Sequence, residues 1–197
     1  MAAAPGDARR VDFGGQAASP EARAVAQWAY AERNAEGRPF AIVDKKLARL
    51  YVFGPDGRLV GATAALLGLA RGDDSVPGIG LKPVNLIAPA ERTTPSGRFE
   101  SVPGRNDKGE AIVWVDYDAA IAIHRVRPGP SAEQRAQRLV TPGADDKRVS
   151  YGCIVVSEGF YEQVVAKTLG RGRGVVYVLP ETRDWQVEFG LSAAGQM

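Results

Sequence analysis

The sequence is built from short apolar runs of strand length, and these runs constrain the fold more than any other feature. They are rich in Ile, Val and aromatic residues, and 23 glycines and 13 prolines punctuate the chain of 197 residues. Such runs, bounded by turn residues, are typical of β-strands joined by turns. The runs cover residues 40–53, 58–67, 111–117, 119–125, 154–156 and 175–179. We therefore predict a mainly β domain.

Helices are expected only around this β region. Ser19, Pro20 and Glu21 form a helix-start pattern, which predicts a helix to about Asn34 within an N-terminal unit of residues 19–39. Further helices are predicted from Ser131 to Leu139 and from Ser157 to Gly170. Gly54-Pro55-Asp56-Gly57 predicts a hairpin turn between residues 40–53 and 58–67. Residues 68–95 are predicted to form a long irregular loop. We expect 1–18 to be a flexible lead and 181–197 a tail of uncertain order.

Composition and charge exclude several classes of protein. Apolar residues make up 45% and charged residues 24% of the chain, an ordinary balance for one globular core. A net charge of +2, without a dense basic run beside aromatic residues, argues against nucleic-acid binding. No apolar run is long enough for a transmembrane helix, and the first residues lack the pattern of a secretory signal.

One cysteine, Cys153, and one histidine, His124, are the residues best suited to catalysis. An imidazole can take the proton of a thiol and return it to a leaving group, so the pair suggests a nucleophile and its base. Gly152 precedes the thiol and leaves room for a substrate carbonyl. The alternative is a buried, inert cysteine and a histidine with a purely structural role.

The motifs around these residues resemble those of L,D-transpeptidase (YkuD-type) catalytic domains. Ile121-Ala122-Ile123-His124 and Ser150-Tyr151-Gly152-Cys153-Ile154 are similar to the family signature. Residues 41–53 resemble its opening hairpin and Thr94-Pro95-Ser96-Gly97 its Thr-Pro-x-Gly turn. The resemblance implies a catalytic domain over 40–180, with a β-sandwich or mixed sheet and two or three peripheral helices. It further implies a transferase of the bacterial periplasm or cell envelope that acts in peptidoglycan biosynthesis and cell shape, with any signal peptide removed from this chain.

Several positions depart from the family pattern. Tyr151 stands in place of a histidine, Arg125 in place of a glycine, and Val155 where Asn or Arg is usual. The 25 residues between His124 and Ser150 are more than the usual pattern has. We interpret the chain as a divergent branch. The insertion over 126–147 is either a solvated loop or a lid whose arginines bind acidic stem peptides.

The resemblance also implies roles for individual residues. Cys153 would form a thioester with a donor stem peptide, and an acceptor amine would resolve it, with cross-links of unusual (1-3) type considered. His124 would be the base, oriented by the carbonyl oxygen of Arg125, and the amides of Gly152 and Cys153 would bind the oxyanion. Tyr151 would donate a hydrogen bond or simply pack. The residues expected to bind substrate are Ser150, Tyr151, Arg148 and Arg127.

Other activities and partners follow from the same residues. The alternatives are an L,D-carboxypeptidase or another cysteine peptidase of peptidoglycan stems, and an inactive domain that binds the cell wall. We expect donor and acceptor stem peptides as partners, and carbapenem-type inhibitors that acylate Cys153. We expect a monomer that uses no metal and no cofactor, since one histidine and one cysteine far apart do not make a zinc site.

Overall fold

A computed structural model describes residues 10–191 and contains one large mixed β-sheet. Eight strands follow the order β3-β2-β1-β10-β5-β6-β7-β9, and β4 and β8 form a small parallel sheet beside them. Only β1 with β10 and β7 with β9 pair in parallel in the large sheet. The strands are β1 Phe40–Asp44, β2 Arg49–Phe53, β3 Leu59–Ala64, β4 Leu67–Gly68, β5 Gly97–Arg105, β6 Ala111–Asp116, β7 Ile121–Arg125, β8 Arg148–Ser150, β9 Ile154–Val156 and β10 Gly174–Val178. The prediction of a mainly β, mixed-sheet fold is confirmed.

The nine-residue strand β5 joins the two halves of the large sheet. Its residues 97–101 pair with β10 and its residues 102–105 pair with β6. One apolar core contains side chains from both halves, including Val43, Val52, Val113 and Ile123. The two halves therefore pack as two layers around the shared core. In the strand order, β7 and β9 lie at the end opposite β3.

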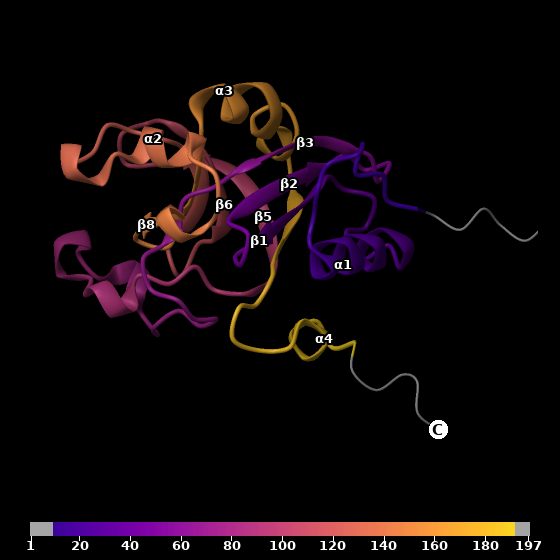
Figure 1. Cartoon of the computed structure of the whole chain (residues 1–197), viewed down its shortest axis with the longest axis horizontal. Coiled ribbons are helices and arrows are strands. Elements are labelled where there is room, and N and C mark those ends of the chain that lie inside the picture. Colours follow the sequence, from indigo (N-terminus) through magenta and orange to yellow (C-terminus); the bar gives the residue numbers. More distant parts are fainter. Residues whose placement is uncertain (1–9, 192–197) are drawn as a thin grey trace, which may run out of the picture.

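The other face of the first half lies under the N-terminal helix α1, Pro20–Ala31. Side chains alternate along a strand, so Ala41 and Val43 enter the first core while Phe40 and Ile42 enter the second. Ser19 caps the helix by accepting the amide hydrogen of Ala22, which confirms the predicted start. Figure 1 shows α1 on the side of the sheet away from α2 and β8.

Ordered structure begins before Ser19, so the prediction of a flexible lead over 1–18 is wrong for its later part. Phe13 is buried and packs edge-on against Tyr51 and Phe53. The prediction assumed that this glycine- and alanine-rich stretch buries too little surface to become ordered. One aromatic ring anchors it in the second core. Residues 1–9 of the predicted lead lie outside the described part.

The segment 40–53 forms two strands, not one arm of a hairpin. The chain reverses between Asp44 and Arg49, where Ala48 adopts a φ of 49°, and β1 then pairs with β2. The predicted turn at residues 54–57 is present and joins β2 to β3, with Gly57 at a φ of 77°. The first turn has no glycine or proline, so the apolar pattern did not reveal it, whereas the resemblance of residues 41–53 to the family's opening hairpin implied it.

The predicted helix 131–139 is shorter and starts later than expected. Gln134 has a φ of 44° and separates a 3₁₀ turn, Ser131–Glu133, from helix α2, Arg135–Val140. Ser131 therefore does not cap α2. Ser157, by contrast, caps α3, Glu158–Phe160, by accepting the amide hydrogen of Phe160, and a π-helical turn, Tyr161–Val165, continues it. A 3₁₀ turn, Leu169–Arg171, ends this region.

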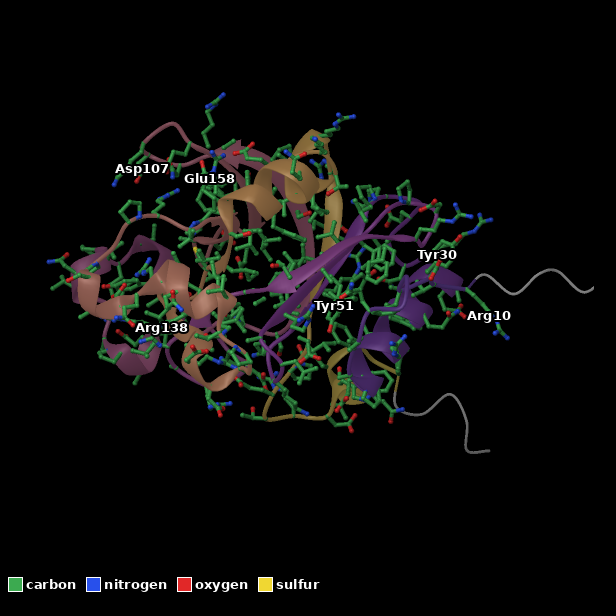
Figure 2. The ribbon with its side chains drawn as sticks, turned by 45° about the horizontal axis from the view of Figure 1, so that its top comes forward. Arg10, Tyr30, Tyr51, Asp107, Arg138 and Glu158 are labelled. Atoms are coloured by element: carbon green, nitrogen blue, oxygen red, sulfur yellow. The ribbon has the colours of Figure 1, made fainter. Side chains whose placement is uncertain are left out.

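The irregular loop 68–95 and the C-terminal segment are more ordered than their sequences suggest. Three 3₁₀ turns lie in the loop, at Ile79–Leu81, Val84–Leu86 and Pro89–Glu91. The described part of the tail holds helix α4, Trp185–Glu188. In Figures 1 and 2, the loop and the insertion with α2 lie at one end of the molecule, and Arg138 marks that end opposite Arg10. No helix in the described part has the length and apolarity needed to cross a membrane.

Candidate active site

A cavity of about 310 Å³ contains both the cysteine and the histidine in its walls. Its lining comes from the irregular loop, the end of the β6–β7 turn, strand β7, the insertion and the loop before β9. The lining residues are Ile79, Gly80, Lys82, Val84, Ile87, Ala119, Ala120, His124, Arg127, Arg135, Ser150, Tyr151, Cys153 and Val155. Five of these residues belong to the irregular loop 68–95, which therefore walls one side of the cavity.

Strand register places His124 and Cys153 on the same face of the sheet. His124 pairs with Val155 across the parallel β7–β9 ladder. Cys153 precedes Val155 by two residues, and side chains two apart point to the same face of a strand. Ile121 and Ile123 point into the core on the opposite face. The strand residues of β7 therefore alternate between the two faces, and Ala120, just before the strand, lies in a turn with a φ of 56°.

The half-buried imidazole of His124 is oriented by one backbone contact. Its Nδ1 lies 2.8 Å from the carbonyl oxygen of Arg125. A carbonyl only accepts, so Nδ1 carries the proton and Nε2 of the neutral ring is left as the basic nitrogen. Burial lowers the pKa of His124, and the positive charges of Arg127 and Arg135 lower it further, against the opposing effect of the Arg125 hydrogen bond. The ring is thus neutral at neutral pH.

The thiol of Cys153 rests on the backbone of the β6–β7 turn. Its Sγ lies 3.6 Å from the carbonyl oxygen of Ala120. In the described part of the chain, the thiol forms no hydrogen bond with His124. Burial raises the pKa of Cys153, while a backbone hydrogen bond from Ala122 and the charges of Arg127 and Arg135 oppose this rise. The resting pair is therefore a neutral thiol and a neutral imidazole.

The loop that carries the thiol is held by hydrogen bonds of its own. Ser150 Oγ donates to the carbonyl oxygen of Cys153 at 2.6 Å and accepts the amide of Gly152 at 3.1 Å. Ser150 is almost fully buried and lines the cavity, and both hydrogen bonds of its hydroxyl group lie within the turn that carries the thiol. The predicted contact of Ser150 with substrate stays a prediction. The Gly152 amide, predicted to bind an oxyanion, is likewise occupied by Ser150.

Glycine is required at position 152 for a steric reason. Gly152 has a φ of 127°, and a Cβ there would lie 2.6 Å from Ile121 Cδ1 and 2.7 Å from the carbonyl oxygen of Thr93. An L-residue adopts this φ only with strain. The sequence reasoning expected the missing Cβ to admit substrate, whereas the structure uses it for close packing of the thiol loop.

Thr94 connects the thiol loop to the rest of the molecule. Its fully buried hydroxyl donates to the carbonyl oxygen of Gly152 at 2.7 Å and accepts the amide of Gly68 at 2.9 Å. Its carbonyl oxygen accepts a hydrogen bond from Lys45 Nζ at 3.0 Å. The Thr-Pro-x-Gly motif seen in the sequence therefore lies directly behind the thiol loop.

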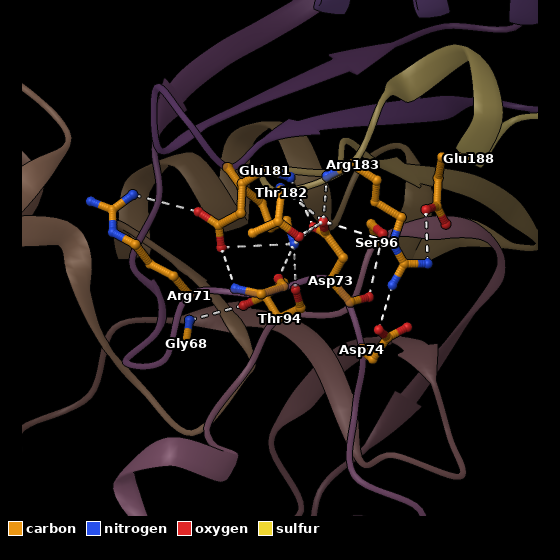
Figure 3. Close-up of polar contacts among 12 residues, drawn as sticks. Gly68, Arg71, Asp73, Asp74, Thr94, Ser96, Glu181, Thr182, Arg183 and Glu188 are labelled. Atoms are coloured by element: carbon orange, nitrogen blue, oxygen red, sulfur yellow. Dashed lines mark hydrogen bonds and ion pairs between the residues drawn. The ribbon is translucent and has the colours of Figure 1, made fainter.

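A buried cluster of charged residues contacts Thr94 and holds it in place (Figure 3). Lys45 Nζ contacts Asp73 Oδ1 at 2.7 Å and the carbonyl oxygen of Gly72 at 2.5 Å. Arg148, at the start of β8, binds both carboxylate oxygens of Glu181 at 2.6 and 3.1 Å and the carbonyl oxygen of Lys45 at 2.9 Å. Arg148 is not among the residues that line the cavity, so the structure gives no support to the predicted contact with substrate. Its charge is neutralised inside the protein.

Asp73 is the acceptor at the centre of this cluster. Burial alone would raise the pKa of its carboxyl group, but hydrogen bonds from Lys45, Thr182 and the amide of Glu181 outweigh burial and hold the pKa well below its usual range. The cluster joins strand β1, the irregular loop, strand β8 and the segment after β10. Such fully hydrogen-bonded buried charges fix one arrangement of the chain.

The remaining predicted residues lie at the rim of the cavity. The guanidinium of Arg92 stacks over the Tyr151 ring at 4.1 Å, so the ring has a packing partner while it lines the cavity. Arg127 lines the cavity and forms an ion pair with Glu110 at 2.6 Å. The side chain of Arg125 turns away to Glu162, at 2.7 Å, and lies over Tyr161. Only the carbonyl group of Arg125 contributes to the site.

Sequence reasoning missed the residues that hold the site from behind. Lys45, Asp73 and Glu181 read as ordinary charged residues near turns, and only their burial reveals their role. Within residues 10–191, no group of three or more His, Cys, Asp or Glu side chains could hold a metal ion.

Comparisons of the sequence give a match over part of the chain to a purine biosynthesis protein from several Brucella species. No family model matches the chain. A stretch of 138 residues, 64% of the chain, is 30% identical to the bifunctional purine biosynthesis protein PurH of Brucella anthropi and covers 26% of that protein. The chain therefore spans about a quarter of the length of the curated relatives it matches. A match of this extent assigns neither activity of a bifunctional protein.

Comparisons of the structure give L,D-transpeptidases and a cell-shape protein. The helical cell shape determining protein Pgp2 from Campylobacter jejuni has a TM-score of 0.46 at 18% identity, over 74% of this chain and 49% of that one. An L,D-transpeptidase of Enterococcus faecium has a TM-score of 0.42 at 17% identity, over 72% and 50% of the two chains. These TM-scores lie below 0.5, so the similarity assigns no role to the residues of this chain.

Proposed function

We propose that this protein is a peptidoglycan L,D-transpeptidase of the bacterial cell envelope that works through a thioester on Cys153. One observation carries the proposal: the single thiol and the single imidazole line one cavity, and the imidazole Nδ1 donates to the carbonyl of the next residue, Arg125. That hydrogen bond leaves Nε2 as the base. The sequence motifs at both residues resemble those of the same family of enzymes.

The proposed reaction has two acyl transfers. The Cys153 thiol leaves the Ala120 carbonyl, His124 Nε2 takes its proton, and the thiolate attacks a carbonyl carbon of the donor stem. The peptide C–N bond breaks, and the leaving amine takes the proton from the imidazolium. An acceptor amine then attacks the thioester and gives a proton to His124 as the C–S bond breaks, and His124 returns that proton to the sulfur of Cys153 to restore the thiol. The amide of Cys153 is the backbone donor we assign to the oxyanion, because Ser150 occupies that of Gly152.

Muropeptide products test the proposal. Purified protein, the Cys153→Ala variant and buffer alone are each incubated with a disaccharide-tetrapeptide, and the products are identified by mass spectrometry. Cross-linked dimers that require Cys153 support the proposal, and their fragmentation gives the linkage position, including the unusual 1-3 type. Shortened monomers without dimers would instead identify an L,D-carboxypeptidase. Unchanged substrate, with a thiol that acylating reagents do not modify, would point to an inactive domain.

A further inference from the structure

A second cavity, of about 640 Å³, lies beside the thiol cavity and shares two residues with it. The insertion between β7 and β8 forms all of its wall, from Val126 to Gln137. Arg127 and Arg135 line both cavities. These two arginines therefore stand where one cavity meets the other. The proposed reaction at Cys153 does not require this second cavity.

The charges that face the two cavities are all positive. Lys82, Arg127 and Arg135 are in the linings, and neither lining contains an aspartate or a glutamate. Each cation has an acidic partner outside the linings: Glu91 for Lys82 at 2.6 Å, Glu110 for Arg127 at 2.6 Å, and Glu133 for Arg135 at 2.5 Å. The linings therefore present cations to a ligand and keep the carboxylates behind them.

These ion pairs also orient the arginines. Arg127 uses Nη2 and Arg135 uses Nε for its glutamate, and each side chain is less than a third exposed, at 28% and 18%. A guanidinium has five N–H donors in a planar fork, so each arginine retains donors for a second acceptor. A cation held in place before binding loses little conformational entropy when a carboxylate arrives.

Both arginines are also close enough to act on the catalytic pair electrostatically. Their charges lower the pKa of His124 and oppose the rise in the pKa of Cys153. An anion bound between the two arginines would therefore lie near the thiol as well as at the entrance to the second cavity.

We propose that Arg127 and Arg135 form a carboxylate-binding subsite between the two cavities, and that the second cavity holds the rest of an acidic peptide whose reacting group lies at Cys153. That this peptide is one of the two peptidoglycan stems rests on the proposed function. The subsite itself does not depend on it.

Because Cys153 is the only cysteine, its alkylation reports on this subsite. Iodoacetate carries a carboxylate and iodoacetamide does not, and both react with the same thiolate, so the ratio of their rates is insensitive to the pKa of the thiol. We expect the ratio to fall roughly two- to threefold in Arg127→Gln and again in Arg135→Gln, from Coulomb's law in a largely aqueous cavity. Arg173→Gln removes an exposed positive charge outside both linings and should leave the ratio unchanged.

The variant that carries both Arg127→Gln and Arg135→Gln decides whether the subsite exists. A ratio equal to that of Arg173→Gln would overturn the subsite. If the double variant does not fold, the native protein can be tested alone. Added salt should lower its ratio of iodoacetate to iodoacetamide rates. A ratio that does not change with salt would also overturn the proposal.

Occupancy of the second cavity is tested with acetyl-Ala-Glu and its diamide. The dicarboxylate should slow the reaction of Cys153 with iodoacetamide, and the diamide should not. Ala136→Phe puts a bulky side chain into the lining of the second cavity and keeps both arginines, so it should abolish the protection while the rate ratio stays at the native value. Protection that survives Ala136→Phe would refute the second cavity as the binding site. None of these measurements requires turnover, so failure to cross-link muropeptides would leave the subsite intact.

Discussion

Replacing Thr94 with valine should weaken the whole protein and loosen the thiol loop. Valine has nearly the shape of threonine, so no cavity forms, but the hydroxyl is lost at a site with no solvent exposure. The amide of Gly68 and the carbonyl of Gly152 then lose their partner. Each unsatisfied buried group costs about 1–3 kcal/mol, so the two groups together predict a loss of about 2–6 kcal/mol. That is a large part of the ~5–15 kcal/mol stability of a typical domain.

Thr93→Val is the matched control, because Thr93 is adjacent and 7% exposed but its hydroxyl has no hydrogen bond to residues 10–191. Its cost should stay below about 1 kcal/mol. Urea unfolding followed by tryptophan fluorescence measures both variants, with unchanged m-values as the sign of an unchanged unfolding reaction. In the native state, Thr94→Val should also alter the alkylation rate of Cys153. Equal stability of the two variants would refute the role of Thr94 as the anchor of the thiol loop.

Three further predictions concern the same region. Gly152→Ala should unfold more easily and lose activity, because its Cβ meets Ile121 and a carbonyl oxygen at a φ of 127°; an unchanged melting temperature would contradict this. The lowered pKa of Asp73 stabilises the fold above the unfolded value of about 3.9, and this contribution disappears as pH falls toward the lower folded pKa. Acid unfolding curves of the native protein should therefore be steeper than those of Asp73→Asn. The raised pKa of Cys153 predicts that its alkylation by iodoacetamide increases with pH to a midpoint above about 8.5, and a midpoint below neutrality would show a preformed thiolate.

Local sequence patterns predicted the parts of the fold that local physics decides. Apolar runs identified the strands, and Ser19 and Ser157 marked helix starts that the structure has. The turn between β1 and β2 contains no glycine or proline, so only the resemblance of residues 41–53 to a family hairpin implied it, and Ala48 adopts its positive φ without any residue-type signal. The burial of Phe13 depends on Tyr51 and Phe53, which are distant in the sequence. Tertiary contacts of this kind leave no periodic pattern.

The candidate site likewise has features that local sequence indicates and features that depend on tertiary contacts. Cys153, His124 and the carbonyl of Arg125 could be named from the sequence, because their residue types and motifs carry the chemistry. The internal partner of Arg148 could not be predicted, since an arginine beside the thiol motif gives no sign that Glu181, 33 residues later, neutralises it inside the protein. The second cavity could not be predicted at all, because it depends on how the insertion folds between β7 and β8.

Acylation of the intact protein by a carbapenem tests the central claim most directly, because it requires both the nucleophile and its base. Mass spectrometry of the native protein should show one covalent adduct, located on Cys153 by peptide mapping. The adduct should be absent in Cys153→Ala and form much more slowly in His124→Ala. A thiol that stays unmodified, or one that is acylated equally fast without His124, would contradict the pairing of these two residues.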